Sequence, residues 1–180
     1  ALPGPAILIG LASLPLIALY PFMKRITYWP QAWLGLTFNW GVLVGWAAVM
    51  GGLGMAPLIL YLAGIAWTLG YDTIYAHQDK EDDALIGVRS TALLFGEASR
   101  QWLWRFFGLT IVLLFAAGWW GSVAWPFYIA LAATAAQFAW QVHDLRPDDP
   151  SDCLAKFRSN RWAGWCVALG LFAAGIVTRL

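Results

Sequence analysis

The sequence predicts an all-α protein, a polytopic transmembrane helical bundle of about six spans. Hydrophobic residues make up 61% of its 180 residues and charged residues only 12%, which is far from the composition of a soluble domain. Long apolar runs alternate with short connections rich in Gly and Pro, such as "MGGLGMAP" and "WWGSVAWP". The eleven Lys and Arg nearly balance the ten Asp and Glu, which argues against a nucleic-acid binder.

Six segments approach the length that a helix needs to cross the hydrocarbon core, about 20 apolar residues. They are expected at about residues 6–22, 32–51, 55–71, 99–119, 123–142 and 162–178. Pro15 is expected to kink the first of them. The connections are short enough to predict antiparallel hairpins, so residues 1–180 are expected to form a single transmembrane domain in a lipid bilayer.

The charges predict an orientation in the membrane. When successive connections are placed on alternate sides, ten of the eleven basic residues fall on one face and only Arg179 on the other. The ten are Lys24, Arg25, Lys80, Arg89, Arg100, Arg105, Arg146, Lys156, Arg158 and Arg161. All ten acidic residues share that face. By the positive-inside rule it is expected to be cytoplasmic, and any chemistry is expected there.

The ends and the two cysteines add little. The chain opens with "ALPGPAILIG", which has neither Met nor a basic region, so we expect a fragment or processed form rather than a signal peptide. Cys153 and Cys166 have no CxxC partner or His-rich neighbour, which leaves a disulfide or a metal site without support.

The tryptophans allow two interpretations. Trp119, Trp120 and Trp125 flank a short connection on the far side, where an aromatic belt at the membrane interface is expected. A second group lies deeper in the predicted spans, where packing and the lining of an apolar cavity both remain possible. This group comprises Trp40, Trp46 and Trp67.

Half of the acidic residues lie close together, between positions 72 and 83 of "GYDTIYAHQDKEDDALIGVRS". On a continuous helix, Asp79 and Asp83 each lie within about 20° of Asp72. Glu81 and His77 would point away from that face. The sequence therefore predicts one helical face with three carboxylates, beginning at the end of an apolar span.

Crowded carboxylates repel one another unless a positive charge neutralises them. Mg²⁺ suits an all-oxygen site and typically combines one or two carboxylates with substrate phosphates. Lys24 and Arg25, at the matching end of the first span, could also meet phosphate or carboxylate oxygens. A solvated acidic loop is the alternative. Against it, Asp72 directly follows an apolar run, where ionisable residues tend to be functional.

Two stretches resemble a known family. "YDTIYAHQDKEDDALIGVRSTALLFG" resembles the second aspartate-rich motif of the UbiA superfamily of intramembrane prenyltransferases. "LYPFMKRITYWPQAWLGLTFNWG" resembles the segment upstream of it in the 4-hydroxybenzoate branch. The resemblance implies a bundle of nine spans with two such motifs facing a central cavity. The first motif is absent from this sequence, so we expect a fragment that lacks the N-terminal spans and is inactive alone.

The resemblance also implies roles for individual residues. Asp72, Asp79 and Asp83 would hold Mg²⁺ on the diphosphate of a polyprenyl donor. Arg25 matches a basic residue that binds either the carboxylate of the aromatic acceptor or the diphosphate. The other basic residues expected to bind substrate are Lys24, Lys80 and Arg89.

The implied reaction belongs to ubiquinone biosynthesis and joins a polyprenyl diphosphate to 4-hydroxybenzoate. Neutralising the leaving diphosphate lets the allylic C–O bond ionise, and the ring carbon ortho to the phenol hydroxyl attacks the cation. Tyr75 or a cavity Trp is expected to stabilise the cation, although packing explains Tyr75 equally well. The expected location is a bacterial or mitochondrial inner membrane, with the site at the cytoplasmic or matrix face.

Other functions are kept as alternatives. Within the superfamily the acceptor could be a naphthoate, homogentisate or haem. A non-catalytic membrane carrier with an acidic mouth would predict ionisable residues within several spans, and none lies in a predicted span core. A CDP-alcohol phosphotransferase would need the signature D-G-x-x-A-R, which is missing. No protein partner is implied.

Overall fold

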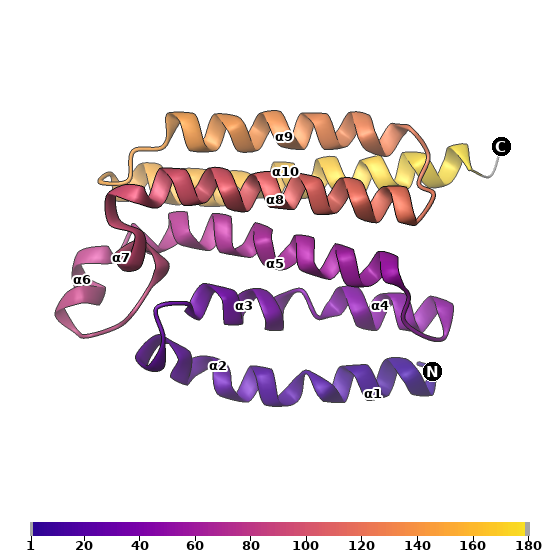
Figure 1. The fold of residues 1–180 in the computed structure, drawn as a ribbon, viewed down its shortest axis with the longest axis horizontal. Coiled ribbons are helices and arrows are strands. Elements are labelled where there is room, and N and C mark those ends of the chain that lie inside the picture. The colour runs from indigo at the N-terminus through magenta and orange to yellow at the C-terminus, as the bar shows by residue number, and fades with distance from the viewer. Residues whose placement is uncertain (1, 179–180) are drawn as a thin grey trace.

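The fold is all-α, as predicted, in a computed structural model that describes residues 2–178 (Figure 1). No strand occurs within those residues. The elements in order are α1 (Gly4–Ala12), α2 (Leu14–Ile26), α3 (Pro30–Phe38), α4 (Gly41–Met50), α5 (Met55–Ala76), α6 (Lys80–Leu85), α7 (Thr91–Phe95), a 3₁₀ turn η1 (Gly96–Ala98), α8 (Ser99–Trp120), α9 (Pro126–Asp144) and α10 (Pro150–Val177).

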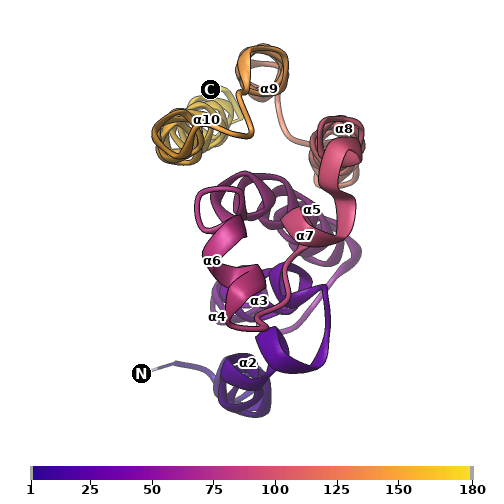
Figure 2. The same ribbon diagram turned by 90° about the vertical axis from the view of Figure 1, so that its left-hand side faces the viewer.

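Helix α5 is the centre of the arrangement. It packs against α8 and α10 on one side and against α3 and α4 on the other, and α1 and α2 lie outside α3 and α4 (Figures 1 and 2). Helix α9 packs on α8 and α10. The short helices α6 and α7 lie together at one end of the bundle, next to the end of α5 (Figure 2).

Five helical segments are long and apolar enough to cross a membrane, judged by length and composition. They are Gly4–Ile26, Pro30–Met50, Met55–Ala76, Thr91–Trp120 and Pro150–Val177. The fifth predicted span, 123–142, coincides with the 19-residue α9, which is not among the five helical segments. The prediction for the last span was too short: α10 begins at Pro150, where the Asp149 side chain accepts from the N–H groups of Ser151 and Asp152.

The first two spans are broken helices whose free backbone groups find partners. The first breaks at Ser13, and α2 then starts with Pro15 in its first turn, in agreement with the predicted kink. The second breaks near Asn39, whose Nδ2 donates to the Gly35 carbonyl at 2.9 Å. Trp40 donates to the Ile9 carbonyl at 2.8 Å and thereby links the two broken spans. Satisfying backbone groups in this way is what apolar surroundings require.

A glycine allows α5 to approach α8 just below the acidic segment. A methyl group added at Gly70 would collide with the ring of Phe107. Phe107 is buried and stacks on Phe138 of α9, with 4.3 Å between ring centroids. Ile74, one turn after Gly70, belongs to the same buried cluster. The last turns of α5 are therefore fixed against α8 and α9 by close packing of the kind that small residues permit between membrane helices.

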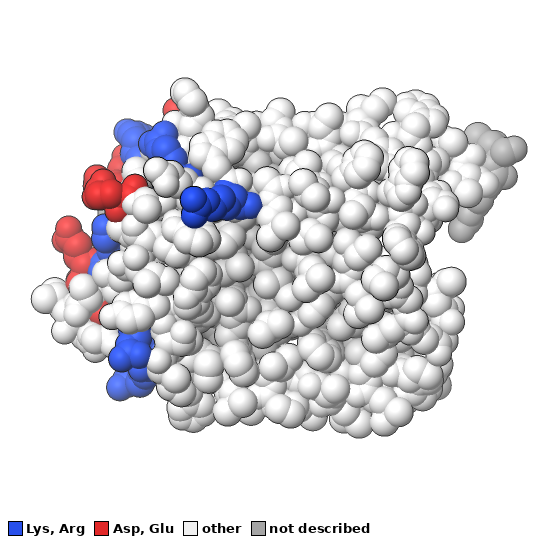
Figure 3. Space-filling view, in the orientation of Figure 1, with Lys and Arg blue, Asp and Glu red and all other residues white. Residues whose placement is uncertain are grey.

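Charged side chains gather at one end of the bundle. In the face shown in Figure 3, the Lys, Arg, Asp and Glu side chains lie where α2 and α5 finish, and most of the remaining surface is uncharged. The turns before α5 and after α8 lie at the opposite end (Figure 1). This separation matches the charge asymmetry in the sequence and leads to a prediction of orientation.

We expect a cysteine placed at Asp79 to be shielded from an impermeant thiol reagent applied to intact cells, and one placed at Ser122 to react. The two positions lie at opposite ends of the bundle. The native thiols, Cys153 and Cys166, would first be replaced by alanine. Labelling at position 79 but not at position 122 would show that the protein has the opposite orientation in the membrane.

Candidate active site

The acidic segment bends sharply where α5 ends. The N–H groups of His77 and Gln78 bond to the carbonyls three residues earlier, at 3.2 and 2.9 Å, which closes α5 with tight turns. A new helix, α6, then starts after Asp79, whose carbonyl accepts from the Asp83 N–H at 2.8 Å. The predicted continuous helix from residue 72 to 83 was therefore wrong.

The bend nevertheless brings the three predicted carboxylates to one cavity. Asp72 from α5, Asp79 from the turn and Asp83 from α6 all line a cavity of about 90 Å³, here called the aspartate cavity. The other side is formed by residues of α2, of the start of α3 and of the segment before α7. The polar members among them are Tyr20, Lys24, Gln31, Arg89 and Ser90.

Negative charge accumulates at this cavity. Asp79 is exposed, and Asp72 and Asp83 are half-buried. Partial burial raises the pKa of Asp83; the charge of Lys24 acts in the opposite direction, and the carboxylates of Asp79 and Asp82 add to the rise. A bound cation would favour the ionised carboxylates, so the electrostatics suit a positively charged ligand or metal ion.

Arg89 fastens the segment after α6 onto the end of α2. Its backbone N–H donates to the Lys24 carbonyl at 2.8 Å, and its Nη1 donates to the Ile26 carbonyl at 2.6 Å. Its guanidinium also lies 5.2 Å from the centroid of the Tyr28 ring. These contacts hold Lys24 and Asp83, which come from distant parts of the chain, at the same cavity.

The remaining basic candidates lie elsewhere. Arg25 is exposed at the end of α2 and is not among the residues that line the aspartate cavity. Lys80 lines a neighbouring cavity of about 300 Å³ together with Glu81, His77 and Asp148. Asp79 lines both cavities. The structure thus separates Lys24 and Arg89 from Arg25 and Lys80, a distinction that the sequence did not reveal.

Glu81 and His77 line the neighbouring cavity and are not among the residues that line the aspartate cavity. His77 is buried, and neither ring nitrogen has a hydrogen-bond partner within residues 2–178. Burial and, to a smaller extent, the charge of Lys80 lower the pKa of His77 to about 4, while the charge of Asp148 opposes the shift. The imidazole is therefore neutral at physiological pH.

An apolar cavity of about 430 Å³ lies deeper along α5. Its lining is mostly apolar and includes Trp67 and Tyr71 of α5, Phe38 of α3 and Phe157 of α10. Polar residues also line it, among them Asn39, Thr68, Arg158, Asn160 and Arg161. Trp67 takes part in this lining, whereas Trp40 packs against Tyr61 with ring centroids 5.6 Å apart. Trp67 also packs on Phe138, with 5.4 Å between ring centroids, so it takes part in both packing and cavity lining.

Tyr75 stands between the two cavities. It lines the aspartate cavity and packs on Phe157, which lines the apolar one, with 4.8 Å between ring centroids. Both expectations for Tyr75, packing at the helix end and a place at the site, agree with this position. A ligand with a polar head and a hydrocarbon tail could place its head, together with a bound cation, at the carboxylates and its tail along α5.

Three polar lining residues were not predicted from the sequence: Tyr20, Gln31 and Ser90. They come from three segments that only the fold brings together. The one signal for Gln31 was its place beside Pro30 at the start of an apolar segment, where a buried amide needs a partner.

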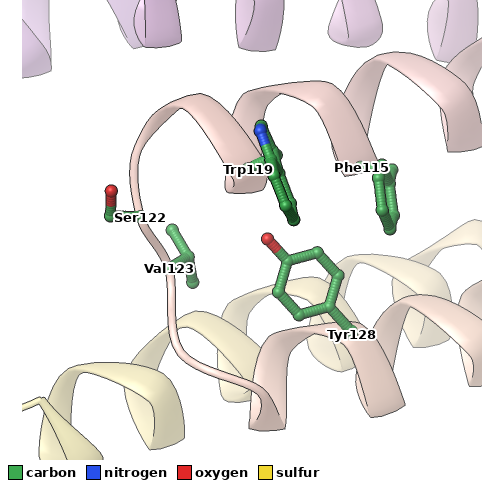
Figure 4. A pocket seen from close by; sticks show the side chains of 5 residues that line it. All are labelled: Phe115, Trp119, Ser122, Val123 and Tyr128. Atoms are coloured by element: carbon green, nitrogen blue, oxygen red, sulfur yellow. The ribbon is translucent and has the colours of Figure 1, made fainter.

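A larger cavity, about 600 Å³, lies beside the turn between α8 and α9, at the opposite end of the bundle (Figures 1 and 4). Phe115, Trp119 and Tyr128 line it, and the Tyr128 hydroxyl points toward Trp119 (Figure 4). None of its lining residues is charged. Trp119, Trp120 and Trp125 are exposed at this end, which suits the aromatic belt expected there.

Fold and site together define a polytopic helical membrane protein with an acidic cavity at the charged end of a span. A family model, the UbiA prenyltransferase family, matches residues 1–165. The chain belongs to this family, as the two sequence stretches indicated. A solved structure, the apo structure of a UbiA homolog from Aeropyrum pernix K1, has the same fold, with a TM-score of 0.75 and 22% identity over 99% of this chain and 66% of that one.

Named relatives are more similar in sequence. A mitochondrial 4-hydroxybenzoate polyprenyltransferase from Caenorhabditis elegans is 49% identical over 97% of this chain and 49% of its own length. The protein of that name from Bos taurus is 52% identical over 92% of this chain and 45% of its own, and that from Arabidopsis thaliana is 48% identical over 91% and 40%. The chain therefore spans about half the length of the curated relatives that it matches.

Proposed function

We propose that the polypeptide containing this chain transfers a polyprenyl group from an allylic polyprenyl diphosphate to the ring of 4-hydroxybenzoate. The observation that carries the proposal is the aspartate cavity, in which Asp72, Asp79 and Asp83 lie beside Lys24 and Arg89. The names and similarity of the relatives support the acceptor. Because they are about twice as long, we assign the facing part of the site to segments outside this chain.

The donor set of the cavity fits a divalent cation. Carboxylate oxygens are the ligands that Mg²⁺ prefers, and Mg²⁺ shares its coordination with waters and substrate phosphates. Within residues 2–178, no three His, Cys, Asp or Glu side chains are placed to hold a metal by themselves. We therefore infer a shared site in which Asp72, Asp79 and Asp83 supply protein oxygens. When bound, Mg²⁺ would neutralise charge on the leaving diphosphate.

Residues of the chain would perform the other tasks. The Lys24 ammonium, at the mouth of the cavity, would meet diphosphate oxygens, and Arg89 would keep Lys24 in place. The face of Tyr75 would stabilise the allylic cation. The apolar cavity beside Trp67 would hold the hydrocarbon chain and exclude water, which would otherwise capture the cation. Arg25, at the exposed end of α2, is kept as a candidate for the carboxylate of the acceptor.

The site would face the cytoplasm in a bacterial inner membrane, or the matrix in a mitochondrial one. The gathering of the charged residues at one end of the bundle supports this placement (Figure 3).

We expect membranes that contain the polypeptide, from a host without this activity, to attach the polyprenyl group to radiolabelled 4-hydroxybenzoate. A chelator should abolish the transfer and added Mg²⁺ should restore it, because the carboxylates would otherwise repel the diphosphate. Extraction of labelled lipid measures the product. Transfer to a naphthoate but not to 4-hydroxybenzoate would refute the proposed acceptor, and transfer that persists with the chelator would refute the metal.

A further inference from the structure

Gln31 is a buried amide at the edge of the aspartate cavity. It lies in the first turn of α3, next to Pro30, and is only 4% exposed. Its Oε1 accepts the backbone N–H of Thr91, the first residue of α7, at 3.1 Å. Thr91 in turn is fixed by a 2.7 Å hydrogen bond between its hydroxyl and that of Thr73 in α5. The position of the Gln31 side chain is therefore set by α3, α5 and α7.

These contacts also determine which way the amide points. A backbone N–H can only donate, so the carbonyl oxygen of Gln31 must face Thr91 and its Nε2 must face the other way. Gln31 lines the aspartate cavity, and no residue in the described range 2–178 accepts a hydrogen bond from its Nε2. Among the described residues, Nε2 of Gln31 is not one of the fully buried polar atoms that lack a partner, so it is open to the cavity, where a ligand oxygen could accept its hydrogen bond in place of water.

We propose that Gln31 is a substrate-contacting residue that donates a hydrogen bond from Nε2 to a diphosphate oxygen of the donor. This inference rests on the proposed function, which places the diphosphate in the same cavity. The aspartates come from α5 and α6, whereas Gln31 comes from α3, so the diphosphate would be held from both sides. A neutral, fixed donor orients the anion without adding a side-chain charge beside Lys24 and Arg89.

The test uses Gln31→Glu in the polypeptide that contains this chain, assayed in membranes. The substitution keeps an oxygen that can accept from the Thr91 N–H, but it replaces the N–H donor by a carboxylate that repels the diphosphate. We expect the KM for the polyprenyl diphosphate to rise about tenfold or more. The KM for the aromatic acceptor should change little. Gln101→Glu is the matched control. Gln101 is exposed in the first turn of α8, so this substitution should leave the KM values for both substrates unchanged.

A second variant covers the case in which Gln31→Glu does not accumulate. Gln31→Met has a similar volume and no charge, and it should show the same selective rise, together with a higher concentration of inorganic diphosphate for half-inhibition. An unchanged donor KM in either variant, or a rise confined to the acceptor, would overturn the role of Gln31. If the unsubstituted polypeptide itself did not transfer the polyprenyl group to 4-hydroxybenzoate, the proposed function would be refuted instead.

Discussion

Asp79→Asn and Asp83→Asn should each lower turnover by about 100-fold or more in the polypeptide that contains this chain. Asparagine keeps the shape of the side chain but removes the negative charge that would hold a cation on the leaving diphosphate. Both positions line the aspartate cavity, and Asp83 lies in the part that the Arg89 contacts hold in place. Steady-state rates at saturating concentrations of both substrates measure the effect.

Glu81→Gln is the matched control. Glu81 lies two residues from each of these aspartates but lines the neighbouring cavity with His77 and Asp148. Removing its charge should leave turnover almost unchanged. Comparable losses at positions 79, 81 and 83 would mean that net acidity of the segment, rather than the aspartate cavity, supports the reaction.

Lys156→Met should lower the free energy of unfolding by about 3 kcal/mol, the effect expected when one partner of a buried ion pair is removed. Lys156 is 3% exposed and bonds to carboxylate oxygens of Asp144 and Asp152. Asp152 is also buried and would keep only Arg146, whose Nη2 lies 3.3 Å from it. Thermal unfolding of the protein in detergent would show the loss as a lower Tm.

The double variant Lys156→Met with Asp152→Leu separates a lost charge pair from lost packing. Removing both buried charges should recover part of the stability, because the carboxylate is then no longer left without its ammonium. Arg161→Met, on the exposed side of the same helix, should change the Tm little. If the double variant instead lost as much free energy of unfolding as the two single variants added together, the buried charge pair would not explain the stability.

Composition and charge predicted the membrane class and the charged end because both depend on averages over many residues. The kink near Pro15 was also predicted, since proline acts locally. The break in the helix after Ala76 was not predicted, because helical periodicity carries no signal for the tight turns at His77 and Gln78. The start of α10 was placed too late because residues 150–161 are polar and extend the helix beyond its apolar part.

The site was predicted more completely on the acidic side than on the other side. Asp72, Asp79 and Asp83 are close in sequence, so they meet despite the bend. Gln31 is brought to them by a hydrogen bond between α3 and α7, segments 60 residues apart. Lys24 and Arg25 are adjacent in sequence and equally basic, so only the fold distinguishes the one that lines the cavity.

The central claim is that the aspartate cavity binds a divalent cation with a diphosphate. The most direct measurement is the anomalous scattering of Mn²⁺ in crystals of the polypeptide soaked with a non-reactive polyprenyl diphosphate analogue. We predict an anomalous peak inside the aspartate cavity, bonded to a carboxylate oxygen of Asp72 or Asp83, with phosphate density between it and Lys24. A peak in the neighbouring cavity beside Glu81 and Asp148, or phosphate density away from α5 and α6, would contradict it.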